Sequence, residues 1–167
     1  MGRYYALAQG ESAEIADAIR DHYKPQGAND DVPSAPLAAM VALADKLDSI
    51  TSLFDAGEKP TGSKDPLALR RAALGVLRIV QFHRWNLDLA AYAAPEVRAF
   101  FAERLKYVLR DEGIPAAVIE AAMPTDTATF APARIAEKTQ DLARWVASEH
   151  GVATIAAMKR IYNILAA

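Results

Sequence analysis

The chain lacks cysteine altogether and holds only three histidines among its 167 residues. The absence of thiols excludes disulfides and thiolate metal sites, and it is typical of a cytoplasmic protein. His22, His83 and His150 are scattered and show no spacing typical of metal ligands. No histidine lies near a serine nucleophile in a recognisable motif, and no thiol is available instead. We therefore expect no catalytic residue, no metal-binding residue and a cytoplasmic location.

Long apolar runs and strand-like patterns are also missing. No stretch approaches the roughly 18 apolar residues of a membrane span, and no leader sequence opens the chain, so we expect neither a membrane segment nor secretion. No stretch alternates apolar and polar residues with period two. Yet 52% of the residues are hydrophobic, enough for a substantial core. We predict an all-α fold, a multi-helix bundle of six to eight helices.

Capping residues, prolines and glycines mark where these helices begin and end. Ser12 predicts the start of a helix that runs to about Tyr23, and Pro36 opens a longer one that runs to about Phe54 and is closed by Gly57. The same signals and helical spacing predict further helices over residues 95–112, 115–123, 135–146 and 155–165, with at most a short helix over 87–93.

The densest chemistry lies in the centre of the chain. Asp65 followed by Pro66 predicts a helix N-terminus, because the carboxylate accepts free backbone N–H groups and proline needs no donor there. One face of this helix is apolar and is made of Leu69, Ala73, Val76, Leu77 and Val80, and Arg71 and Arg78 share a different face. The preceding loop, residues 57–64, would lie where a helix N-terminus favours an anion such as phosphate. Simple capping by Asp65 is the alternative.

This loop nearly spells a nucleotide-binding P-loop. That motif requires Gly-Lys-Ser/Thr after a buried strand. Here Ser63 precedes Lys64, so the order is reversed, and the segment before the loop is helical in pattern. We therefore exclude an ATP-binding P-loop.

Charge is distributed unevenly, although the net charge is only −2. Residues 59–86 hold six basic side chains and one acidic, whereas residues 1–58 hold four basic and ten acidic. Such a positive segment can meet a phosphate backbone locally while the acidic remainder opposes indiscriminate binding. The alternative is a solvated helix face whose cations pair with acidic neighbours.

Several stretches resemble a known family. They read ADKLD at residues 44–48 and KPTGSKDPLALRRAALGVLRI at 59–79, with MGRYYA at 1–6, HYKP at 22–25 and KRIYNIL at 159–165. Together they resemble the β subunit of bacterial heterotetrameric glycyl-tRNA synthetase, in one order along the whole chain. Because that subunit is several times longer, the resemblance implies that this chain is an internal fragment.

The resemblance also implies a domain organisation and a role. Residues 1–86 would be the C-terminal part of an HD-like helical domain, and residues 87–167 a helical extension leading toward an anticodon-binding domain. The fragment would contribute tRNA binding and scaffolding to glycylation of a glycine-specific tRNA, with the α subunit as a partner. The fragment itself would bind no cofactor, whereas the complete enzyme would use ATP and Mg. The alternative is a purely structural module that docks to the α subunit or to the rest of the β subunit without touching tRNA.

Basic residues are the candidate tRNA contacts. We expect Lys59, Lys64, Arg70 and Arg71 to face phosphates, with the Gly62–Ser63 backbone assisting at the helix N-terminus. In the scaffold alternative, Asp65, Arg70 and Arg71 would form internal ion pairs. Lys159 and Arg160 are further candidates at the C-terminal end, although Met158 stands where the family usually has asparagine.

Asp45 and Asp48 lie three residues apart, close enough on a helix to share a cation. By resemblance, ADKLD occupies the last-aspartate position of an HD phosphohydrolase fold, whose metal also needs an upstream histidine and a His-Asp pair. His22 does not supply that pair, because Asp21 precedes it. We therefore predict no metal and no hydrolase site here, with Asp45 structural.

Overall fold

The computed structural model describes residues 1–27, 29–60, 65–125 and 128–165. Within these ranges the chain forms eight α-helices, one short 3-10 helix and no strand, which confirms the predicted all-α class. The elements are α1 (Gly2–Ala8), α2 (Ala13–Asp21), α3 (Pro36–Asp55), α4 (Leu69–Phe82), η1 (Leu89–Ala91), α5 (Pro95–Asp111), α6 (Ala116–Ala122), α7 (Pro132–Ala147) and α8 (Glu149–Leu165).

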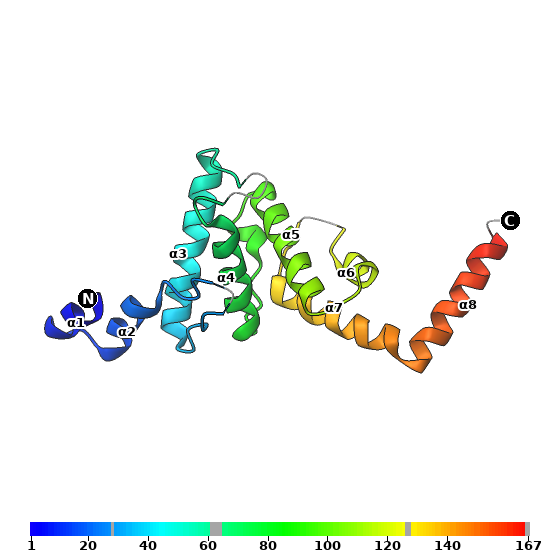
Figure 1. Cartoon of the computed structure of the whole chain (residues 1–167), viewed down its shortest axis with the longest axis horizontal. Coiled ribbons are helices and arrows are strands. Elements are labelled where there is room, and N and C mark those ends of the chain that lie inside the picture. Colours follow the sequence, from blue (N-terminus) through cyan, green and yellow to red (C-terminus); the bar gives the residue numbers. More distant parts are fainter. Residues whose placement is uncertain (28, 61–64, 126–127, 166–167) are drawn as a thin grey trace.

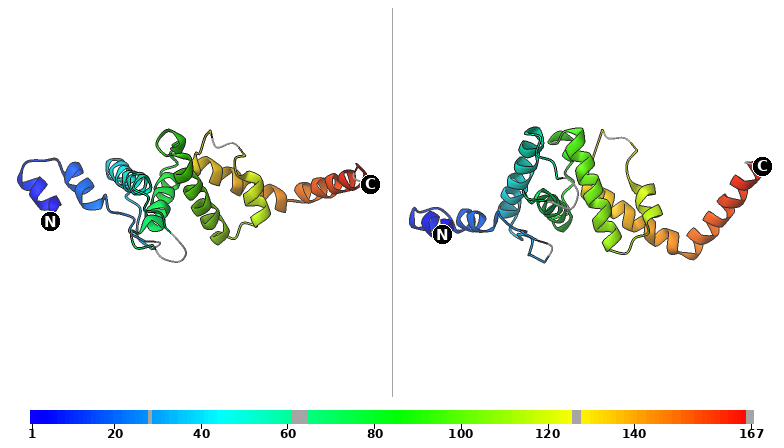
Figure 2. Two further views of the ribbon diagram at one scale, coloured as in Figure 1. Left: turned by 90° about the horizontal axis from the view of Figure 1, so that it is seen from above. Right: turned by 45° about the horizontal axis from the view of Figure 1, so that its top comes forward.

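The helices form an elongated array that follows the order of the sequence (Figure 1). The α1–α2 pair packs on α3, α3 packs on α4, and α4 packs on both α5 and α7. At the far end α8 packs on α7 and extends away from the other helices, as the further views also show (Figure 2). Among the described residues, no helix is both long enough and apolar enough to cross a bilayer.

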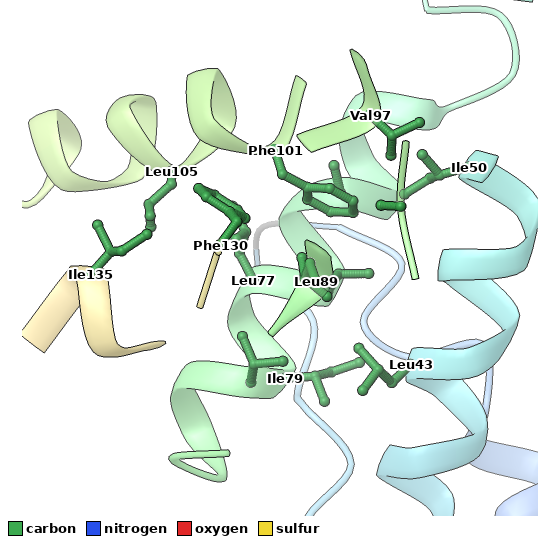
Figure 3. Packing of buried hydrophobic residues seen from close by; sticks show 14 of the residues in the cluster. Leu43, Ile50, Leu77, Ile79, Leu89, Val97, Phe101, Leu105, Phe130 and Ile135 are labelled. Carbon is green, nitrogen blue, oxygen red and sulfur yellow. The ribbon is translucent and has the colours of Figure 1, made fainter. Parts of the chain in front are cut away.

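A single hydrophobic core joins α3, α4, α5 and α7 (Figure 3). Each of these helices contributes buried side chains to it, among them Ile50 of α3, Leu77 of α4, Phe101 of α5 and Ile135 of α7. The apolar face predicted for the central helix is confirmed, since all five of its members are buried. The core contains residues from both sides of residue 86, so the two predicted parts of the chain, 1–86 and 87–167, pack their side chains against each other.

Most predicted helix ends are confirmed. The Ser12 hydroxyl accepts a hydrogen bond from the Ile15 N–H, 3.3 Å away, at the start of α2. Both α3 and α5 carry proline in their first turn. Gly57 and Gly113, which follow these two helices, have φ angles of +83° and +84°, the left-handed conformation that glycine adopts without strain.

The predicted start of the central helix is wrong. Pro66 and Leu67 form a turn, Ala68 has a φ of +56°, and α4 begins only at Leu69. Asp65 is therefore not the N-cap residue. Its carboxylate nevertheless reaches forward and accepts the backbone N–H of Arg70 at 3.0 Å, so it still satisfies one free donor of the first turn. The Asp-Pro pair therefore lies just before the helix, and the predicted N-cap was three residues too early, since the N-cap is Ala68.

Asp88 fastens η1 to a distant part of the chain. Its carboxylate accepts the Ala90 N–H at 2.9 Å and the Phe130 N–H at 2.8 Å, and the Leu89 N–H donates to the Phe130 carbonyl at 2.8 Å. These hydrogen bonds hold two segments that are 42 residues apart beside the core. The Phe130 and Ala90 N–H groups, in that order, lower the pKa of Asp88.

We expect the Asp88→Asn variant to be less stable than the parent at neutral pH, because the neutral amide accepts these hydrogen bonds more weakly. The pKa of Asp88 is lower in the folded state than in the unfolded state, where it is about 3.9. The ionised carboxylate therefore stabilises the fold at pH values above the unfolded-state pKa, and this contribution is lost as pH falls through the folded-state pKa. The difference in melting temperature should therefore shrink below about pH 4. Thermal unfolding from pH 7 to 3 tests this, with Asp48→Asn at an exposed position as control. A difference independent of pH would contradict it.

Candidate nucleic-acid interface

Three of the segments singled out in the sequence meet around one loop. This loop connects α2 to α3, its described residues are 22–27 and 29–35, and it lies against α3 and α4. Lys46 of the ADKLD segment and Arg78 of the central helix both donate hydrogen bonds to its backbone carbonyls. Segments separated by up to 51 residues are therefore joined by side-chain to main-chain hydrogen bonds.

Lys46 is a buried lysine with backbone partners. Its side chain is 6% exposed, and its Nζ donates to the Tyr23 carbonyl at 3.0 Å and to the His22 carbonyl at 3.5 Å. A Cβ placed on Gly75 would lie only 2.8 Å from Lys46 Cε, so the absence of a side chain at residue 75 gives the lysine its path. Burial lowers the pKa of Lys46, opposed by the carboxylates of Asp45 and Asp30.

Arg78 holds the other end of the loop. Its Nη1 donates to the Gly27 carbonyl at 2.8 Å and its Nη2 to the Asp30 carbonyl at 2.7 Å. The Asp30 carboxylate accepts the Gln26 N–H at 2.8 Å, and this hydrogen bond is the main cause of its lowered pKa. The two arginines of the predicted basic face therefore differ. Arg78 forms hydrogen bonds within the fold, whereas Arg71 is exposed to solvent.

A pocket of about 330 Å³ opens beside Lys46. Its wall combines the loop, α3 and the start of α4, and the lining residues are Tyr23, Pro25, Gln26, Asp45, Lys46, Ser49, Leu67, Ala68, Leu69, Arg71 and Ala72. Two of these lining residues, Tyr23 and Arg71, are exposed to solvent. The pocket therefore offers an aromatic ring, a guanidinium and a hydroxyl within a wall that the buried Lys46 stabilises.

The predicted basic contacts near α4 have different environments. Arg71 is exposed, and besides this pocket it lines a second hollow of about 350 Å³ toward α5. Lys59 pairs with Glu96 of α5, with 2.7 Å between Nζ and Oε1. Arg70 is half-buried, with its backbone N–H on Asp65. Lys64 and the Gly62–Ser63 backbone lie outside the described residues.

The two C-terminal candidates lie elsewhere. Lys159 and Arg160 are exposed on α8, at the opposite end of the array from α1 and beyond α7 (Figure 1). The structure therefore does not bring them together with Arg70 and Arg71 on α4. Any single ligand that meets both groups must extend along several helices.

The paired aspartates lie on the exposed side of α3. Asp45 lines the rim of the 330 Å³ pocket, and Asp48 lies one turn further along. Within the described ranges, no group of three or more potential metal ligands comes together. His83 has a structural contact instead, since its Nε2 lies 2.8 Å from the Pro33 carbonyl.

Sequence reasoning missed the anchoring roles of Lys46 and Gly75. A signal was present, because Ala39, Leu43, Lys46 and Ile50 follow helical spacing and all four are buried. A lysine within an apolar stripe must find partners for its ammonium group. Its acceptors, 23 and 24 residues upstream, carry no mark in the sequence because they are main-chain carbonyls.

The described residues form an all-helical module in which three of the segments that carry the resemblance, at residues 22–25, 44–48 and 59–79, meet around one loop. A family model described as "Glycyl-tRNA synthetase beta subunit" matches residues 1–124. The chain belongs to this glycyl-tRNA synthetase β-subunit family.

Two curated relatives extend the similarity to the end of the chain. The glycine–tRNA ligase β subunit of Phenylobacterium zucineum is 48% identical over 167 residues, which is 100% of this chain and 25% of the relative. That of Paracoccus denitrificans is 45% identical over 176 aligned residues, covering 99% of this chain and 25% of the relative. The chain thus spans about a quarter of the length of these relatives.

Proposed function

We propose that this chain is the tRNA-contacting and scaffolding part of a glycine–tRNA ligase β subunit and performs no chemistry by itself. The complete cytoplasmic enzyme would join glycine to its tRNA with ATP and Mg, together with an α subunit. Family membership supports this role, and one observation carries the RNA contact. Six of the seven charged side chains in residues 59–86 are basic, and Arg71 among them is exposed beside a pocket built from three family segments.

The chemistry of the pocket suits a nucleic-acid strand. An arginine guanidinium forms charge-assisted hydrogen bonds with phosphate oxygens, and an exposed aromatic ring can stack on a base. Arg71 and Tyr23, which both line the pocket, supply these groups. Lys46 would act indirectly, because its ammonium group is directed to the loop carbonyls and keeps the loop in place.

Charge reversal tests the RNA contact. In a full-length β subunit carrying this segment, assembled with its α subunit, we expect Arg71→Glu to weaken tRNA binding by about tenfold at 0.1 M salt and to reduce the slope of log K against log salt by about one. The control is Arg134→Glu, at an exposed position of α7. Affinity and salt slope equal to those of the control would refute the proposal.

A second function has a specific observation in its favour. Lys59 pairs with Glu96 and Arg78 donates to two loop carbonyls, so part of the positive charge is used inside the fold. The chain would then be a scaffold that docks to the α subunit or to the rest of the β subunit without touching tRNA. The same experiment separates the two functions, because a scaffold loses no tRNA affinity when Arg71 is reversed.

A further inference from the structure

The last helix, α8, presents an apolar face to solvent. Met158, Tyr162 and Leu165 are 65%, 73% and 82% exposed, and with the half-buried Ile155 they follow the spacing of one helical face. Gly151 is the one residue of α8 that is buried. The element against which α8 packs is α7, and that contact lies at the start of the helix. We name this face, Ile155 with Met158, Tyr162 and Leu165, the α8 stripe.

Apolar side chains also lie on the remaining surface of α8, where Val152, Ile161 and Ile164 are 59%, 55% and 75% exposed. Arg160 and Asn163 lie outside the α8 stripe, and Lys159 lies at its edge, by helical spacing. A helix that exposes this much apolar surface normally buries part of it against a neighbour. A lone helix of this length is only marginally stable in water, so tertiary packing must supply the difference.

The direction of α8 is set by a tight elbow. Ser148 Oγ accepts the Gly151 N–H at 3.1 Å and donates to the Trp145 carbonyl at 2.6 Å. The two helices approach so closely that a Cβ on Gly151 would collide with the Trp145 carbonyl. Helix α8, which carries the α8 stripe, is therefore held away from the core of this chain by the turn at residues 148–151 (Figure 1).

We propose that the α8 stripe is an internal docking surface, covered by an apolar helical surface from the rest of a longer β-subunit polypeptide. The curated relatives are about four times as long as this chain, so they contain ample further polypeptide, and the Phenylobacterium relative matches this chain across α8 as well. The inference rests on family membership and on the stripe, and it does not depend on the proposed RNA contact. Docking of the stripe leaves Arg160 on the uncovered side.

Hydrogen exchange tests the occupant. We expect amides of residues 155–165 to exchange about 100-fold more slowly in a full-length β subunit carrying this segment than in the 167-residue chain. Equal exchange in the two proteins would overturn the proposal. So would protection that appears only with the α subunit or only with tRNA. Protection in the 167-residue chain that rises with its concentration, together with a dimeric mass, would assign the surface to a second copy.

A pair of matched variants provides an independent readout. Tyr162→Asp places a carboxylate in the α8 stripe, and Asn163→Asp places the same side chain one residue later, outside it. In the full-length β subunit, Tyr162→Asp should abolish the protection of residues 155–165 while Asn163→Asp retains it. A Tyr162→Asp subunit that fails to fold while Asn163→Asp folds counts as the expected result, and equal behaviour of the two variants overturns the proposal.

Discussion

Replacement of Lys46 by alanine is expected to lower the free energy of unfolding by about 3 kcal/mol. The substitution removes three buried methylene groups that pass over Gly75, each contributing about 0.8 kcal/mol. It also leaves the Tyr23 carbonyl without its donor, which costs about 1 kcal/mol more. Urea unfolding of the 167-residue chain measures the change. A loss below about 1 kcal/mol, typical of a surface position, would contradict the anchoring role.

Lys46→Met is the matched control, because it keeps most of the stem and removes the charge. We expect less than half of the loss seen with alanine. Burial lowers the folded-state pKa of Lys46, so the cost of burying its charge is complete below that pKa and declines as pH rises toward the unfolded-state value, about 10.4. The stability of the parent relative to Lys46→Met should therefore increase as pH rises from the folded-state pKa toward about 10.4. A constant difference would show that the ammonium has no such penalty.

Gly151→Ala is expected to reorient α8 while leaving the core intact. The new methyl group would collide with the Trp145 carbonyl and lie 3.1 Å from Val146 Cα, and both atoms belong to main chain that cannot rotate away. Because α7 is the main packing neighbour of α8 among the described residues, opening the elbow relieves the clash at a lower free-energy cost than moving the core. At 1.5 Å per residue α8 is about 25 Å long, so an opening of about 20° moves its far end by roughly 9 Å.

A distance between two labels measures this movement. The chain has no cysteine, so Met40→Cys on α3 and Arg160→Cys on α8 create two unique attachment points for spin labels. The distance distribution should shift by several ångströms in Gly151→Ala. It should stay unchanged in Gly27→Ala, because a Cβ at Gly27 has no atom within 4 Å. An unshifted distribution in Gly151→Ala would show that the elbow tolerates the methyl group.

Helices with both a boundary signal and an apolar stripe were predictable from the sequence. Ser12, Pro36 and Pro95 mark the starts of α2, α3 and α5, and these starts depend only on local hydrogen bonding and proline geometry. The helix α1 was missed because it has seven residues and depends on close packing of Gly2 against Ile19. Such a short helix gains its stability from tertiary contacts, which leave no local pattern.

The sequence indicated which segments line the candidate site, but it did not indicate which side chains and main-chain atoms are in contact there. The sequence pointed to the ADKLD segment and to the central helix, and residues of both, Arg71 among them, line one pocket. The anchors could not be foreseen, since Lys46 and Arg78 donate to main-chain carbonyls whose identity depends on how the loop folds back. For the same reason Asp88, whose partner Phe130 lies 42 residues away, attracted no attention.

Because the core contains residues from both sides of residue 86, it determines which helices unfold together. Side chains of α3, α4, α5 and α7 bury one another, so none of these helices retains its buried face when its neighbours open. They should melt in a single cooperative transition. Helix α8 keeps a set direction through the hydrogen bonds at residues 148–151, but it adds little buried surface to that cluster and should unfold locally at a far lower free energy. The four core helices thus form one cooperative unit, and α8 can unfold while that unit stays folded.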